Sequence, residues 1–105
     1  MNIRVYSNSD VLKIVAFIPP GHRHMRLAIF LKDQVIVLQE ASIAAIARAY
    51  LEIATHPTRK AIEYIQRKLD KEVRKPGYAE YQLIEVDKTE EEILREIQGF
   101  FENNT

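Results

Sequence analysis

Short runs of β-branched and aromatic residues, separated by polar turn residues, dominate the first third of the chain. Such runs are typical of strands, because these side chains pack well on a pleated surface. They predict strands at 3–7, 11–18, 25–32 and 35–39. The middle two runs are apolar at both alternating sets of positions, so both faces of the sheet need a cover.

The segments between these runs predict turns. Ser7 to Asp10 is short and polar, which favours a hairpin turn between the first two strands. Pro19 and Pro20 each lack a backbone donor, so the segment up to His24 must be a loop. Asp33 and Gln34 are then left to join the last two strands as a second hairpin.

A helical period begins after residue 40. Apolar residues spaced for one helix face predict a helix that buries Ile43, Ile46, Ala47, Tyr50, Leu51 and Ala54. The other side carries Ala44, Ala45 and Ala49, which would permit close approach of a neighbour but are also simply good helix formers. His56-Pro57 ends this helix, because the residue before a proline is disfavoured in the α region.

A second and a third helix follow from similar patterns. A narrow apolar seam predicts a helix over 58–74, formed by Ile62, Ile65, Leu69 and Val73. A fifth strand is expected at 78–86. Thr89 and Glu92 then match a capping box, which starts a helix expected to bury Ile93, Leu94, Ile97, Phe100 and Phe101.

Together these elements predict one α+β domain over 1–105. We expect an antiparallel sheet of about five strands, in the order β-β-β-β-α-α-β-α, packed with three helices. A chain of 12.2 kDa should expose roughly 6,000 Å² when folded and roughly 18,000 Å² when unfolded. If the helices cover only one face of the sheet, a second copy of the chain must cover the other, which favours a symmetric dimer.

Composition narrows the chemistry. The chain has no cysteine, which excludes disulfides, thiolate metal sites and cysteine nucleophiles and suits a reducing interior. Arg4 interrupts any signal-like apolar core, and no stretch approaches the length of a bilayer span. We therefore expect a soluble cytoplasmic protein with no membrane partner. The 29% of charged residues, without Cys or Trp, is typical of a thermophile's composition.

Charge is balanced overall but segregated along the chain. Residues 1–55 carry 6 basic and 4 acidic side chains, 56–76 carry 7 and 3, and 77–105 carry 2 and 8. On the predicted helix over 58–74, one basic face would be shared by Lys60, Tyr64, Arg67 and Lys71, with Arg74 or Lys75 at its end. Together with Arg23 and Arg26 in the prolyl loop, this face could bind a nucleic-acid backbone.

Two other interpretations of this charge pattern stay open. The pairs Glu63–Arg67 and Asp70–Arg74 have the spacing of an ordinary solvated helix face, and a pI near 6.8 is low for a dedicated nucleic-acid binder. Alternatively, the basic region and the acidic C-terminal region meet, within one chain or across a dimer.

Candidate catalytic and metal groups are few. His22 and His24 alternate in a loop, and His56 or Glu40 could supply a third metal ligand, although no zinc-type spacing is present. The same three histidines could in principle act as general acids and bases. No serine has a nucleophile-elbow context and no glycine pattern forms a phosphate loop, so no cofactor is implied.

The leading interpretation is a small intracellular binding or adaptor domain that self-associates as a homodimer and has no catalytic residues. The alternative is nucleic-acid backbone binding through the basic residues named above. The third interpretation is a histidine- or metal-dependent hydrolase built on His22, His24 and His56.

Overall fold

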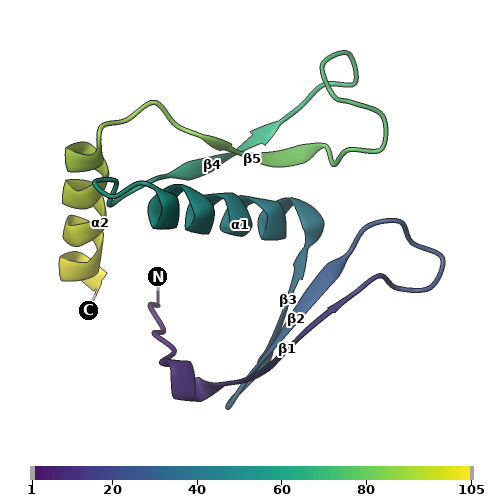
Figure 1. The fold of residues 1–105 in the computed structure, drawn as a ribbon, viewed down its shortest axis with the longest axis horizontal. Helices are drawn as coiled ribbons and strands as arrows, with labels where there is room; N and C mark the ends of the chain where they lie inside the picture. The colour runs from purple at the N-terminus through teal and green to yellow at the C-terminus, as the bar shows by residue number, and fades with distance from the viewer. Residues whose placement is uncertain (1, 105) are drawn as a thin grey trace.

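Residues 2–104, which the computed structural model describes, form two small antiparallel sheets joined by a helix (Figure 1). The first sheet has the strand order β1-β2-β3, and the second pairs β4 with β5. The strands are β1 (Val11–Phe17), β2 (Arg26–Leu31), β3 (Val35–Gln39), β4 (Tyr64–Lys68) and β5 (Tyr81–Glu85). The helices are α1 (Glu40–Thr55), which follows β3 directly, and α2 (Glu90–Asn104). Neither helix is long and apolar enough to cross a bilayer within residues 2–104.

The α+β class is confirmed, but the single sheet of about five strands with three helices is wrong. The predicted strand at 3–7 does not form. Instead, Arg4 pairs with Asp33, and the Tyr6 hydroxyl accepts a hydrogen bond of 2.6 Å from Gln34 at the β2–β3 turn. The expected hairpin turn is a short 3₁₀ helix, Asn8–Asp10, because the Asp10 carboxylate accepts the Ser7 N–H at 2.9 Å.

The predicted helix over 58–74 is also wrong, because residues 64–68 form β4 and the chain turns beyond them. Ile65 lies opposite Ile84, and Gln66 lies opposite Leu83. Helix propensities of Lys, Arg and Glu differ from those of other residues by only tenths of a kcal/mol, roughly, so pairing with a distant strand overrides the local period. The basic helix face therefore does not exist.

Where local signals are strong, the predicted elements form. The predicted strands at 11–18, 25–32 and 35–39 appear as β1, β2 and β3, and His56 is the C-cap of α1. The start of α2 is also as predicted, since the Thr89 hydroxyl accepts the Glu92 N–H at 3.2 Å.

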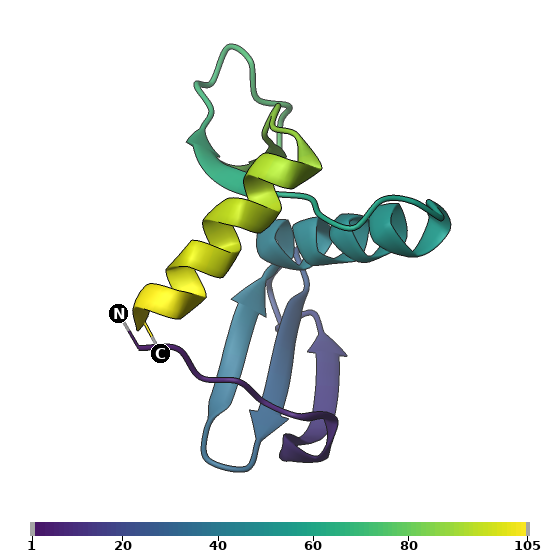
Figure 2. The same cartoon turned by 90° about the vertical axis from the view of Figure 1, so that its left-hand side faces the viewer.

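The helix α1 buries a different face from the one predicted. It lies between the two sheets and crosses the ends of the β2 and β3 strands (Figures 1 and 2). Its packed side is the small one, with Ala45 only 4% exposed, while Ile46, Tyr50 and Leu51 of the predicted stripe are exposed. Small side chains allow the close approach to β5 that this arrangement needs.

The apolar stripe of α2 is exposed as well, contrary to prediction. The helix stands at one side of the molecule and packs sparsely on other elements (Figure 2). Lys88 pairs with Glu63 at 3.2 Å and with Glu96 of α2 at 2.8 Å, which fixes the N-terminal end of the helix. These hydrogen bonds raise the pKa of Lys88, and the bond to Glu96 contributes most. Polar ties, more than apolar packing, position α2.

The interior is very small. Among residues 2–104 the buried apolar side chains are Ala28, Leu31 and Ala45. The accessible surface is 8523 Å², against the roughly 6,000 Å² expected for a compact chain of this mass. The radius of gyration is 16.1 Å, where about 13 Å is usual for this length. The single chain therefore leaves apolar surface exposed that a folded protein ordinarily buries.

Candidate interaction surfaces

The first candidate surface is one face of the first sheet. Val15, Ala28 and Val37 lie opposite one another across the three strands. On the same face, Phe17 extends the row along β1 and Val35 along β3. Val15 is 40% exposed and Val37 is 56% exposed. We call these five residues the apolar sheet face, and no element among residues 2–104 covers it fully.

The opposite face of β1 is apolar too. Ile14 lies opposite Ile29, and Leu12 near the start of the strand and Ile18 directly after its end are exposed. Strand β1 thus presents large apolar side chains on both sides while lying at the edge of its sheet. Exposed apolar surface of this extent is typical of a protein–protein interface.

The second candidate surface is a groove of about 990 Å³ between the two hairpins. His24 and Arg26 line it from the β1–β2 loop and the start of β2, and the segment Gly77–Gln82 lines it from the second hairpin. The first turns of α1, as far as Arg48, close it on the third side. Residues far apart in the sequence therefore meet here.

Two arginines, Arg26 and Arg48, supply positive charge to the groove lining. Arg26 donates to the carbonyl oxygens of His24 at 3.1 Å and Met25 at 3.3 Å. Arg48 donates to the Leu83 carbonyl at 3.0 Å, and its guanidinium lies 5.5 Å from the centre of the Tyr64 ring. Within the described chain neither arginine pairs with a carboxylate, so both are oriented by neutral acceptors and keep their full charge for an incoming anion.

The rest of the groove lining is mixed. Tyr78 and Tyr81 are exposed and lie in the lining. Each acidic residue of the lining has a side-chain partner: Glu40 contacts the His24 ring, and Glu80 lies 3.4 Å from Lys68. The carboxylates are thus engaged within the chain, while the arginines have no carboxylate partner among the described residues.

The residues predicted to form a basic helix face are dispersed. Lys60 lies in the loop before β4, where its backbone N–H donates to Glu90 at 3.2 Å. Tyr64 and Arg67 are three positions apart on β4 and so project to opposite faces, and Lys71 lies in a turn. Of the predicted set, Arg26 lines the groove from the start of β2, and Arg23 lies three positions before it in the β1–β2 loop.

The three histidines do not converge. His24 pairs with Glu40 at the start of α1, whereas His56 caps the other end of this 16-residue helix, about 24 Å away. His22 is exposed in the β1–β2 loop. In the described part of the chain, no three His, Asp or Glu side chains are grouped in a way that could hold a metal ion.

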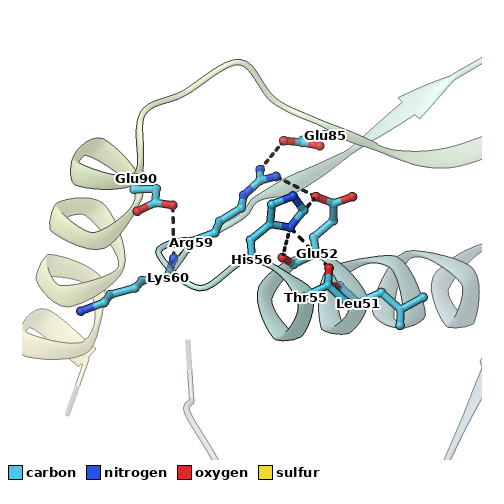
Figure 3. Close-up of polar contacts among 8 residues, drawn as sticks. All are labelled: Leu51, Glu52, Thr55, His56, Arg59, Lys60, Glu85 and Glu90. Atoms are coloured by element: carbon cyan, nitrogen blue, oxygen red, sulfur yellow. Dashed lines mark hydrogen bonds and ion pairs between the residues drawn. The ribbon is translucent and has the colours of Figure 1, made fainter.

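A polar junction ties α1 to β5 (Figure 3). Arg59 bridges Glu52 at 2.9 Å and Glu85 at 2.6 Å, and the hydrogen bond to Glu85 raises the pKa of Arg59. His56 donates from Nδ1 to the Glu52 carbonyl at 2.8 Å, which caps the last turn of the helix. Each group in this junction is engaged with another, so its role is structural.

The sequence interpretation missed the groove, and above all Arg48. One feature of the sequence pointed to Arg48. It lies one helical turn after Ala44, so it places a charged residue on the alanine side of α1, which is the packed side of the helix. Tyr78 and Tyr81 are also exposed in the groove lining.

No family model, curated protein or solved structure matches this chain. Its function must be inferred from the apolar sheet face and the groove.

Proposed function

We propose that this protein is a non-enzymatic binding module that works as a homodimer in a reducing compartment such as the cytoplasm. The observation that carries the proposal is the excess of exposed surface, roughly 2,500 Å² above that of a compact chain of equal mass. Obligate homodimers bury roughly 1,000–2,500 Å² per protomer. The excess is therefore of the size that one partner of equal mass would remove.

Charge favours a second copy over an unrelated partner. Residues 56–76 carry 7 basic and 3 acidic side chains, while residues 77–105 carry 2 and 8. Some of these charges already pair within one chain, as in Arg59–Glu85 and Lys68–Glu80. A second copy offers the complement of the remaining charges in both regions, and the chain as a whole is neutral. Apolar burial would supply the affinity in such a dimer, and charge would fix the orientation.

The test is the mass of the particle in solution. Size-exclusion chromatography with light scattering should give twice the mass of the chain at micromolar concentration. The midpoint of chemical unfolding should rise with protein concentration, because association and folding are linked. A monomer at high concentration that unfolds cooperatively, with a midpoint independent of concentration, would contradict the proposal.

The groove supports a second candidate function, binding of a single-stranded nucleic acid. Arg26 and Arg48 could contact phosphates, since neither has a carboxylate partner within the described residues. Tyr78 and Tyr81 are exposed in the same groove and could stack on bases. Lys60 and Arg67, which the sequence grouped with Arg26, are absent from the groove lining.

A single substitution with a matched control tests this candidate. Arg26→Gln should weaken binding of a fluorescent single-stranded oligonucleotide by roughly tenfold at low salt, since contacts to charged groups contribute about 1.5–3 kcal/mol. Arg95→Gln removes the same charge from α2, outside the groove lining, and should leave the affinity nearly unchanged. Equal losses in both variants, or no binding by the native chain, would exclude the groove as a nucleic-acid site.

A further inference from the structure

The edge of the first sheet formed by β1 has no partner strand. Strand β1 is the outermost strand of its sheet, with β2 on its inner side. Its outer N–H and C=O groups make no backbone hydrogen bond to any other described residue. A row of free backbone groups is a template for another strand.

This edge carries little of the usual protection against pairing beyond one lysine and an irregular register near its start. Proteins blunt exposed edges with charges, prolines or bulges. Here the one charged residue of β1 is Lys13, the irregular register lies between Val11 and Lys13, and the prolines come only after the strand. The opposite edge, β3, is shorter and runs directly into α1, which leaves less room for a partner.

We infer that two copies of this chain pair antiparallel along β1, with Val15 on the twofold axis. The inference rests on the proposed homodimer and assigns its interface. The sheets of the two protomers, with three strands each, would then become one continuous sheet. Exposed apolar side chains lie on both sides of the edge, with Ile14 on one face and Val15 and Phe17 on the other, so pairing would add side-chain contacts on both faces.

The sequence of the strand selects this register. With Val15 opposite its own copy, Leu12 lies opposite Ile18 and Ile14 opposite Ala16, while Lys13 lies opposite Phe17. Centring on Ile14 would place Leu12 opposite Ala16 and Asp10 opposite Ile18, and centring on Ala16 would bring Pro19 opposite Lys13. The Val15 register alone places the exposed Leu12 opposite the exposed Ile18, and it leaves Pro19 at the end of the ladder, opposite Val11.

The absence of native cysteine makes a cross-linking test clean. Residues directly opposite in an antiparallel pair have Cα atoms about 4.5–5.5 Å apart, within the range that a disulfide spans. Val15→Cys should therefore form a disulfide-linked dimer under mild oxidation, in most of the protein. In the same register the two copies of residue 12 are about 20 Å apart, six residues along the strand, so Leu12→Cys should stay monomeric on a non-reducing gel.

A double variant completes the design. Leu12→Cys with Ile18→Cys should cross-link between chains, although Leu12→Cys alone does not. Amide hydrogen exchange gives a second measurement without any substitution: alternate β1 amides should become protected as concentration rises, while the outer amides of β3 should not.

The outcomes separate this inference from the proposed function. A dimer by light scattering in which Val15→Cys does not cross-link, or in which β1 amides exchange equally at all concentrations, overturns the β1 interface and leaves the homodimer standing. Cross-linking of Leu12→Cys alone as efficiently as Val15→Cys overturns the register. A native chain that is monomeric at every concentration overturns both.

Discussion

The first sheet and the β4–β5 hairpin are both antiparallel, but different forces hold them in the molecule. The hairpin is tied by ion pairs within the chain, such as Arg59–Glu85 and Lys68–Glu80. The cross-strand neighbours of the first sheet are apolar, for example Ile14 opposite Ile29, and much of that apolar surface is exposed.

The difference indicates which part of the protein is complete in one chain. Charged groups near a surface can satisfy each other locally and need little burial. Apolar side chains are stabilised only when water is removed from them, which requires another surface. Under the proposed homodimer, the hairpin is complete within one protomer, whereas the first sheet is completed by the second copy.

The largest expected effect is on the first sheet. Val15→Lys would place two lysines side by side at the proposed twofold axis and should raise the dimer dissociation constant by roughly a hundredfold, because each charge would be buried without a partner. Sedimentation equilibrium measures the change. Val73→Lys adds the same charge at an exposed turn of the second hairpin and should have no effect. If both variants changed the dissociation constant equally, the proposed dependence of the first sheet, and not the hairpin, on dimer formation would be contradicted.

A smaller effect is expected on the buried side of α1. Ala45 is 4% exposed, so Ala45→Leu should overpack this side of the helix and lower the free energy of unfolding by about 1–3 kcal/mol. Ala47→Leu, on the exposed side of the same helix, should change it by less than about 0.5 kcal/mol. Urea denaturation at fixed protein concentration compares them, and a larger loss for Ala47→Leu would mean that the helix packs by its other face.

Substitution in the polar junction around Arg59 should have a smaller effect than Val15→Lys or Ala45→Leu. Arg59→Gln removes the bridge between Glu52 and Glu85 and should lower the melting temperature by a few degrees, with a smaller difference at high salt because the ion pairs are then screened. Arg67→Gln is the control, since Arg67 is exposed and has no ion-pair partner among the described residues. A salt-independent difference would show that Arg59 acts through packing.

The smallest effect concerns pH. Hydrogen bonds from the Ser7 backbone N–H and then its hydroxyl lower the pKa of Asp10. The folded-state value is therefore below the unfolded one, so the contribution to stability is present above about pH 4 and is lost as pH falls through the folded-state pKa. Asp10→Asn should show a weaker fall in melting temperature than the native chain below about pH 4. Identical acid profiles would contradict this role.

The sequence predicted the elements whose information is local. The Thr89 cap, the His56-Pro57 stop and the three strand runs between residues 11 and 39 each depend on neighbouring residues, and each is present, whereas the run at 3–7 forms no strand. The helix over 58–74 failed because Ile65 is stabilised by Ile84, nineteen positions away, and no local period reveals that pairing.

The candidate surfaces were predicted only in part. The apolar character of β1 on both faces was visible as a pattern, and it is what the structure exposes. The face that α1 buries was not predictable from hydrophobicity, because the helix buries the small Ala45 and leaves the larger Ile46 and Leu51 exposed. The groove depends on bringing Arg26, Arg48 and Tyr81 together, which only the tertiary fold determines.

The junction between β3 and α1 has a mechanical consequence. Gln39 ends the strand and Glu40 begins the helix, so no loop separates the two elements. A change of twist in the first sheet would be passed directly to the first turn of α1, which forms one wall of the groove. In the proposed homodimer, subunit pairing and binding in the groove would then be energetically coupled, each altering the affinity of the other by the same factor.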